Sequence, residues 1–414
     1  MTAEFRDALA RWYSAAVAAV QPERVFRRYA RCSDGVFEFV RDTRRVQLSL
    51  PWRGGRLRVI GIGKAALGTA RGFRASLRAA GHDINDGLLI VRDPPIESTA
   101  EPWKILFGNH PYPGEDSTRA AQSLLEFIGE PRSDDCFVLL LSGGASALCA
   151  LPAPGVTLED KRRATMALMH SGASIAEINR LRQQLSAIKG GRLGARLAPA
   201  SFATLAISDV PGDDPLVIGS APTWSEELAR RGSQYAVVAT LDDALDAAAG
   251  AAQTEGFDAV PLGRCLYGSV EHETMRMIKE IERYRLKSHR HRPGVLIAGG
   301  EPLVAVRGSG RGGRAQELAL RLGISLGAGG GETQVDRITG LVAGTDGSDG
   351  PTTAAGAFFD ATTRARAERV GIDLALTLET NDSGSALQTL DDLFVTGPTG
   401  TNVADILMVV MPSR

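Results

Sequence analysis

The segment GVLIAGGEPLVAVRGSGRGGRAQELALRLGISLG, residues 294–327, combines three local patterns in a short span. Its first residues, 294–301, predict a buried strand, and residues 315–327 have the apolar spacing of a helix. Between them, a short β-like piece (303–307) precedes a loop, 308–314, with four glycines and two arginines in seven residues. Glycine is retained where the backbone takes unusual φ values or approaches a ligand closely. The loop is therefore either a simple hairpin connection or an anion site at a helix N-terminus.

The same order of strand, glycine turn and helix occurs twice earlier, in RLRVIGIGKAALGTARGFRASL (56–77) and DCFVLLLSGGASALCALP (135–152). Strands and helices alternate along most of the chain, which predicts an α/β fold with mostly parallel sheets covered on both faces. The pattern restarts near 224–235, so we expect two domains, 1–233 and 234–414. Nearly every glycine motif follows a strand, where open α/β sheets bind their ligands.

The composition excludes several classes of function. The chain has 414 residues, 43% hydrophobic and 23% charged, as in ordinary soluble proteins. A formal net charge of −1 gives no overall attraction to nucleic acid or membrane surfaces. No run of 18 apolar residues predicts a transmembrane helix, and the N-terminus is unlike a signal peptide. The four cysteines are scattered without a CxxC pair, so we expect neither disulfides nor zinc, and a cytoplasmic protein.

Two lysines stand in glycine motifs of a chain that has only six lysines against 41 arginines, Lys64 in GIGKAA and Lys189 in AIKGGR. GIGK is a weak match to a dinucleotide fingerprint, because Ala66 occupies the third glycine position, and no Walker A motif is present. Lys64 either contacts a phosphate or carboxylate or is a solvated side chain in a tight turn. Its pattern alone leaves both interpretations open.

The turn Ser142-Gly143-Gly144 also follows an apolar strand. Its main-chain N–H groups could hold an anion, and we favour this over a purely structural turn. A serine nucleophile is the weakest interpretation, because the GxSxG elbow and a histidine in a triad motif are absent.

Carboxylates follow other strands. Asp209, in SDVPGDDP (208–215), stands where it could act as a base toward a hydroxyl or bind Mg²⁺. Asp346 and Asp349 lie in the glycine loop GTDGSDGPT (344–352), and VTGPTGTN (395–402) is an oxygen-rich loop. Anion cradles, isolated cations and strand-end carboxylates together favour phosphoryl transfer.

Six motifs, in this order, resemble those of the class II glycerate 2-kinases: SGGASAL, LSAIKGGRL, ISDVPGDDP, GGEP with VRGSGRGGRAQEL, GTDGSDGP and TGPTGTN. The C-terminal part of that family is called the MOFRL domain, and some members are labelled hydroxypyruvate reductases. The resemblance implies ATP- and Mg²⁺-dependent phosphorylation of D-glycerate at its 2-hydroxyl. It also implies two α/β/α domains, a Rossmann-like N-terminal one and a smaller C-terminal one, with the active site in the cleft between them.

The resemblance carries over catalytic positions at Lys64, Asp209 and Arg314. In our hypothesis Asp209 accepts or orients the hydroxyl proton, and the two cations neutralise charge on the phosphoryl group and the glycerate carboxylate. Mg²⁺ would bind at Asp209 and Asp346. The expected substrate- and phosphate-binding residues are Ser142, Gly143, Gly144, Lys189, Gly308, Gly310, Arg311, Gly312, Gly313, Asp346, Asp349 and Thr399.

Two departures from the family pattern put the substrate in doubt more than the fold: Ala315 replaces an asparagine, and Thr353 an acid. An NAD(P)H-dependent hydroxypyruvate reductase and a non-catalytic nucleotide- or sugar-acid-binding protein stay open as alternatives. The partners we expect are small molecules, with neither nucleic acid nor membrane. The sequence leaves a homodimer open.

Overall fold

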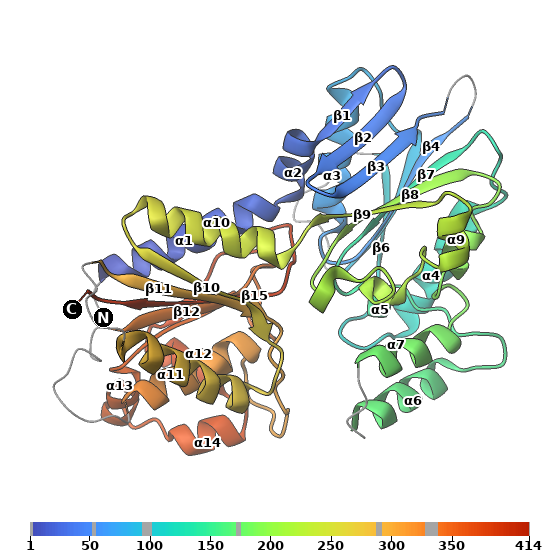
Figure 1. Ribbon diagram of the computed structural model, residues 1–414. Helices are drawn as coiled ribbons and strands as arrows, with labels where there is room; N and C mark the ends of the chain where they lie inside the picture. Colours follow the sequence, from blue (N-terminus) through green and yellow to red (C-terminus); the bar gives the residue numbers. More distant parts are fainter. Residues whose placement is uncertain are drawn as a thin grey trace. The chain divides into compact units, whose positions relative to one another are not determined.

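A computed structural model describes residues 3–51, 55–92, 102–170, 175–286, 292–327 and 338–413 (Figure 1). The chain divides into two compact units. The N-terminal unit comprises Gln21–Thr240 with Gly400–Asn402, and the C-terminal unit comprises Met1–Val20, Leu241–Thr399 and Val403–Arg414. The division we predicted at 233/234 therefore differs in three respects, of which the return of Gly400–Asn402 to the N-terminal unit is one. Residues 234–239 pair with the N-terminal sheet, and the first helix packs on the C-terminal sheet.

Six parallel strands form the central sheet of the N-terminal unit, in the order β6-β5-β4-β7-β8-β9. They are β4 (Leu57–Ile62), β5 (Asp86–Val91), β6 (Trp103–Phe107), β7 (Cys136–Leu141), β8 (Ser201–Ile207) and β9 (Gln234–Ala239). Every residue of β4 and β7 is buried. The sequence of β7 is apolar throughout, as a strand covered on both faces requires, whereas β4 includes the buried Arg58, which pairs with Asp86. The chain builds outward from β4 to β6 and then returns to β7. The switch in strand order therefore lies between β4 and β7, where open α/β sheets bind ligands.

Helices cover both faces of this sheet. Ile60 and Ile62 share an apolar cluster with Leu124 of α4, whereas α3 packs its Phe73 against Phe37. The helices are α2 (Pro22–Tyr29), α3 (Ala66–Arg78), α4 (Glu115–Ile128), α5 (Ala145–Leu148), α6 (Leu158–His170), α7 (Ile175–Gln184), α8 (Arg192–Ala195) and α9 (Glu226–Arg230), with short 3₁₀ turns η1 (Pro211–Asp213) and η2 (Ile218–Ser220). A small antiparallel sheet consists of β1 (Ala30–Ser33), β2 (Val36–Arg41) and β3 (Arg44–Ser49).

The C-terminal sheet has six strands in the order β10-β11-β15-β12-β13-β14. They are β10 (Asp258–Leu266), β11 (Gly294–Gly300), β12 (Thr339–Gly344), β13 (Gly356–Asp360), β14 (Leu393–Phe394) and β15 (Asp405–Met411). Only β10 and β11 pair in parallel, and the other four pairs are antiparallel. The prediction of mostly parallel sheets thus holds for the N-terminal unit but not for this one. The reason is that β15, the last strand, inserts antiparallel between β11 and β12.

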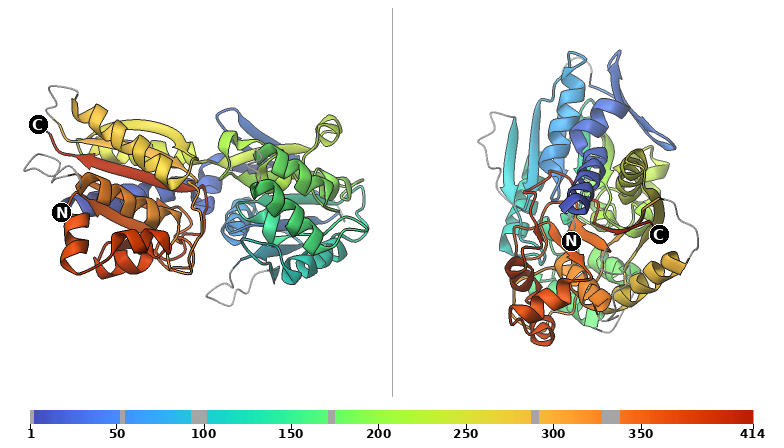
Figure 2. Two further views of the ribbon diagram at one scale, coloured as in Figure 1. Left: turned by 90° about the horizontal axis from the view of Figure 1, so that it is seen from below. Right: turned by 90° about the vertical axis from the view of Figure 1, so that its left-hand side faces the viewer.

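Three layers make up the C-terminal unit (Figure 1, Figure 2). Helices α1 and α10 pack together on one face of the sheet, and α11 and α12 cover the other. The α/β/α expectation is confirmed here despite the antiparallel strands. The helices are α1 (Ala3–Val20), α10 (Leu241–Thr254), α11 (Val270–Leu286), α12 (Arg314–Gly327), α13 (Thr363–Arg369), α14 (Leu374–Glu379) and α15 (Ser383–Thr389). The predicted β-like piece at 303–307 is not a strand; only Leu303 forms an isolated bridge.

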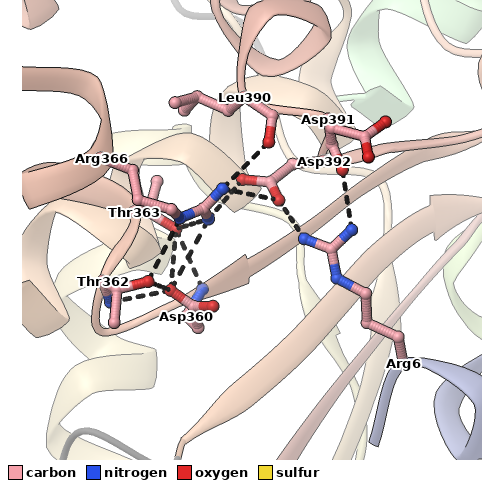
Figure 3. A network of polar contacts seen from close by, with 8 residues as sticks. All are labelled: Arg6, Asp360, Thr362, Thr363, Arg366, Leu390, Asp391 and Asp392. Atoms are coloured by element: carbon pink, nitrogen blue, oxygen red, sulfur yellow. Dashed lines mark hydrogen bonds and ion pairs between the residues drawn. The ribbon is translucent and has the colours of Figure 1, made fainter. Parts of the chain in front are cut away.

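A buried ion network holds α1 to this unit (Figure 3). Arg6 of α1 pairs with the carboxylate of Asp392 and donates to the Asp391 carbonyl oxygen over 2.7 Å. Arg366 of α13 reaches the other side of Asp392, with Nη2 2.7 Å from Oδ2. The Tyr13 hydroxyl adds a hydrogen bond to the Gly344 carbonyl oxygen, 2.7 Å away. The first helix is therefore an integral part of the C-terminal unit.

None of the helices in the described residues has the length and apolar character needed to cross a membrane.

Candidate functional site

At the switch point, main-chain amides of the turn after β4 donate hydrogen bonds to the turn after β7. The amide of Lys64 donates to the Gly143 carbonyl oxygen (2.9 Å), and the amide of Ala65 donates to Oγ of Ser142 (3.0 Å). Ser142 is only 1% exposed. Its hydroxyl therefore braces two turns, rather than facing a ligand as the sequence predicts.

Asp209, just beyond β8, brings its carboxylate against the second turn. A Cβ atom on Gly143 would lie 1.9 Å from Oδ2 of Asp209 and 2.1 Å from Nδ2 of Asn402. No side chain fits at this point, so Gly143 is required by close approach. Asn402 donates from Nδ2 to Oδ2 of Asp209 over 2.9 Å and is 4% exposed. The carboxylate is therefore held in one position directly over Gly143.

Lys64 and His110 lie next to the following glycine. Gly144 has φ 83°, and a Cβ atom there would be 3.1 Å from Cδ2 of His110 and 3.4 Å from Cγ of Lys64. The amides of Gly143 and Gly144 donate to no acceptor within the described part of the chain. A lysine, two amides and a carboxylate thus gather at the carboxyl ends of β4, β7 and β8.

Asn402 and His110 are additions to the predicted site. Asn402 lies in the oxygen-rich loop 395–402, and His110 lies in a loop with glycine and proline turn residues, 108–116. Asn402 could have been suspected from the oxygen-rich TGPTGTN motif. Nothing in the sequence distinguishes His110 from other loop histidines.

Lys189 does not join this group. It is 2% exposed, and its Nζ donates to the carbonyl oxygen and Oγ of Ser146, at 2.6 Å and 2.5 Å. Burial lowers its pKa well below the usual value, and the nearby charges of Lys161 and Arg182 lower it further.

In the C-terminal unit, Arg314 begins α12 between two acids. Its Nε lies 2.6 Å from Oδ2 of Asp405, and its Nη2 lies 2.7 Å from Oε1 of Glu301. Burial opposes the guanidinium charge, but Asp405 and Glu301 raise the pKa of Arg314 well above its usual value. Its Nη1 makes no hydrogen bond to the described residues. Arg314 is thus fixed by protein and keeps one amino group for a ligand. The two acids were not among the predicted residues.

The glycine loop 308–314 approaches protein more closely than the phosphate-cradle prediction assumes. A Cβ atom on Gly308 would lie 2.4 Å from the carbonyl oxygen of Thr380, and one on Gly310 would lie 2.6 Å from the same atom. The Gly310 amide donates to that oxygen over 2.9 Å. These glycines allow the loop to pack closely on residues 380–384. This packing alone explains why glycine is needed here, whether or not a nucleotide binds.

The remaining residues of the loop, 311–313, also lie close to other parts of the protein. A Cβ atom on Gly312 would lie 2.3 Å from Oγ of Ser383, and one on Gly313 would lie 2.2 Å from Oδ1 of Asp349. The Arg311 amide donates to Oδ1 of Asp382 over 2.8 Å, and the residue is exposed. The amides of Gly308, Gly310 and Arg311 are therefore bound to protein, and close protein contacts account for Gly312 and Gly313, so phosphate binding by this loop stays a prediction.

Asp349 is buried and caps helix α12. Its Oδ1 accepts from the Ala315 amide (3.2 Å) and its Oδ2 from the Gln316 amide (2.8 Å). Burial and the neighbouring Asp405 carboxylate raise the pKa of Asp349 to about 7, although both amide bonds oppose the shift. The carboxylate of Asp349, which we predicted to bind a ligand, thus binds the first amides of α12 instead.

Asp346 and Thr399 lie together where two loops meet. The Thr399 amide donates to the Asp346 carbonyl oxygen over 3.3 Å, and Oδ1 of Asp346 accepts from the Ser348 amide over 2.9 Å. Among the described residues, no three His, Cys, Asp or Glu side chains form a group that could hold a metal ion. The proposed metal ligands Asp209 and Asp346 belong to different units, and each offers one carboxylate.

The two departures from the family pattern differ in their surroundings. Ala315 is fully buried in the apolar cluster beneath α12, and Thr353 is exposed. The alanine is therefore a packing residue in this chain.

Comparison with known proteins identifies the family. Residues 8–247 match the model described as a domain of unknown function (DUF4147), and residues 294–405 match the MOFRL family. A D-glycerate 2-kinase of Thermotoga maritima is 34% identical over 85% of this chain and 90% of its own length. The chain belongs to the glycerate 2-kinase family. The crystal structure of glycerate kinase from Thermotoga maritima matches 99% of each chain, with a TM-score of 0.77 and 30% identity.

Family members bear two kinds of name. An Agrobacterium vitis protein, provisionally named a hydroxypyruvate reductase, is 36% identical over 86% of this chain and 100% of its own. Because relatives carry both names, the reductase activity has to be compared with the geometry of the first βα turn.

Proposed function

We propose that this chain is an ATP-dependent glycerate kinase that phosphorylates the 2-hydroxyl of D-glycerate. The observation that carries the proposal is the Asp209 carboxylate, held by Asn402 over Gly143 at the switch point of the N-terminal sheet. A carboxylate in a fixed position is suited to accept the proton of an attacking hydroxyl. The glycerate kinases among the relatives support the same reaction.

The other groups of this unit suit the anionic parts of the reactants. Lys64 and the amides of Gly143 and Gly144 provide donors close to the carboxylate. Phosphoryl transfer depends on positioning and charge neutralisation more than on covalent chemistry, so these donors would bind phosphoryl oxygens or the glycerate carboxylate. Arg314, with its free Nη1, is the corresponding donor in the C-terminal unit.

Mg²⁺ is part of the proposal. Proteins usually bind Mg²⁺ through one or two carboxylates, with substrate phosphates and water completing the shell. Asp209 fits this role, and Asp346 is the candidate in the C-terminal unit. When bound, the ion neutralises charge on the phosphate oxygens.

The first βα turn argues against a reductase. A dinucleotide pyrophosphate binds the main-chain amides of this turn in Rossmann folds. Here the amides of Gly63, Lys64 and Ala65 donate to Ile90, Gly143 and Ser142 over 3.0, 2.9 and 3.0 Å. These bonds would have to break before the turn could hold a dinucleotide.

The experiment follows ADP release with ATP, Mg²⁺ and D-glycerate, beside NADH and NADPH oxidation with hydroxypyruvate. We expect glycerate-dependent ADP release, a product that enolase converts directly, and no nicotinamide oxidation. Asp209→Asn should lower kcat by about 10²- to 10⁴-fold, the usual contribution of a general base. Hydroxypyruvate reduction, or ATP binding without turnover of any sugar acid, would contradict the proposal.

A further inference from the structure

Three basic side chains of the N-terminal unit interact electrostatically with one another, outside the Asp209 group. Lys161 comes from α6, Arg182 from α7 and Lys189 from the turn after α7 (Figure 1). Lys161 and Lys189 are 3% and 2% exposed, and Arg182 is half-buried. The chain has six lysines, and two of them are buried at this one place.

Among the residues that the structure describes, no acid neutralises this group. None of the three side chains forms an ion pair with a carboxylate of the described residues, and Nζ of Lys161 is buried without any hydrogen-bond partner. Burial of an unpaired cation is unfavourable, and like charges at one place add to the penalty. Burial, together with the charge of Arg182, lowers the pKa of Lys161 to about 8. Within the described ranges, the group therefore lacks a counter-anion.

Polar side chains line the same place. Lys189 donates to Ser146 on α5, and Oγ of Ser146 lies 3.0 Å from Oγ of Ser220. Ser220 in turn contacts Oδ1 of Asn179, 3.1 Å away, one helical turn before Arg182. Hydroxyl groups and cations around one point are the donors that an oxyanion with several charged oxygens requires.

The two serines that line this place belong to the same two segments as the proposed active-site residues. Ser146 follows the Gly143-Gly144 turn after β7, and Ser220 belongs to the segment after β8 that also carries Asp209. Through Lys189 the basic group thus contacts α5, the helix that follows the Gly143-Gly144 turn.

We propose that Lys161, Arg182 and Lys189, with Ser146 of α5, form a phosphate-binding site. The sequence marks only Lys189 as a phosphate ligand; the structure adds Lys161 and Arg182. This site depends on the proposed function in one respect only, the identity of the compound that supplies the phosphate. That compound is either the nucleotide or the phosphoglycerate product. An anion there supplies the missing counter-charge and accepts the donors of Lys161.

Thermal unfolding of the full chain with and without inorganic phosphate tests the site. We expect phosphate to raise the Tm of the wild type, as a ligand of the native state does. Lys161→Met removes the unpaired charge at nearly constant volume, so it should raise the Tm without phosphate and abolish most of the phosphate-dependent increase. Lys104→Met, at an exposed position of β6, is the matched control and should behave as the wild type. A full increase in Lys161→Met, or none in the wild type, would overturn the phosphate-binding site.

Titrations with ADP and with 2-phosphoglycerate then identify the source. Loss of the Lys161 donor should weaken binding of the relevant compound by about tenfold, the value of a hydrogen bond to a charged group. Unchanged affinity for both compounds would refute the assignment. Because these are binding measurements, they also work in Asp209→Asn. A wild type that binds phosphate through Lys161 but does not phosphorylate glycerate would refute the proposed function alone.

Discussion

The side-chain amide of Asn402 donates to the carboxylate of Asp209 over 2.9 Å, although 193 residues separate them in the chain. The segment Gly400–Asn402 packs with the N-terminal unit, whereas the residues on both sides of it belong to the C-terminal unit. The chain thus returns to the N-terminal unit for three residues, and one of them orients the proposed base.

Asn402→Ala should lower kcat for glycerate phosphorylation by about tenfold or more, the value of a hydrogen bond to a charged group. The KM for ATP should change little, because Asn402 acts on Asp209. Activity measured at saturating ATP and glycerate checks the effect. If Asn402 acts only through Asp209, the double variant with Asp209→Asn should be no slower than Asp209→Asn alone. Additive losses would contradict this positioning role.

Gly143→Ala should inactivate the enzyme, because the new methyl group would lie 1.9 Å from Oδ2 of Asp209. The carboxylate and Asn402 must then move. Gly250→Ala is the matched control, since it lies inside α10 with no heavy atom within 4 Å of the new methyl group. The control should be fully active and slightly more stable, as alanine is a better helix former. Wild-type kcat in Gly143→Ala would show that the carboxylate position is not critical.

The meeting of Lys64, Gly143 and Asp209 follows from the sequence. Each comes directly after a buried strand, and the carboxyl ends of parallel strands share one edge of the sheet. The contribution of Asn402 could not be predicted in this way, because no local pattern indicates that residues 400–402 pack with the other unit. The order of β15 in the second sheet escaped prediction for a similar reason, since the final strand carries no sign of its neighbours.

The glycines of residues 308–313 show most clearly what the sequence cannot predict. The sequence correctly indicates that residues 308–313 approach something closely, but not what they approach. The partner is the segment 380–384, whose carbonyl and carboxylate oxygens accept the loop amides. A nearby phosphate and a nearby protein segment impose the same demand for a missing side chain.

Asp349 should make the stability of the protein depend on pH between about 4 and 7. Its pKa is raised to about 7 in the folded state, so the native protein binds the proton more tightly than the unfolded chain. Stability from this group is present below the unfolded pKa of about 3.9 and is lost as pH rises through 7. Denaturant unfolding of the wild type and Asp349→Asn at pH 5, 6, 7 and 8 measures it. The variant should gain stability relative to the wild type as pH rises, and parallel curves would contradict the assignment.

Arg366→Met should destabilise the C-terminal unit more than Arg6→Met. Asp360 and Asp392 are 1% and 0% exposed, and Arg366 contacts both (Figure 3). Removing one partner of a buried ion pair typically lowers the free energy of unfolding by about 3–5 kcal/mol. Arg6 is 26% exposed, and its loss leaves Asp392 paired with Arg366. Urea unfolding of the two variants compares them, and equal losses would show that Arg366 is not the centre of the network.

Arg314→Ala should reduce both activity and stability, because the arginine has two separable tasks. Its Nη1 is available to a ligand, while Nε and Nη2 neutralise Asp405, whose side chain is 5% exposed. Removal of the guanidinium leaves that carboxylate buried without its partner, which should lower the free energy of unfolding by roughly 3 kcal/mol. The double variant Arg314→Ala/Asp405→Asn removes the uncompensated charge and should recover much of the stability. Its kcat should stay low if Arg314 also binds the phosphoryl group or the glycerate carboxylate. Recovery of kcat together with stability would instead restrict Arg314 to holding Asp405.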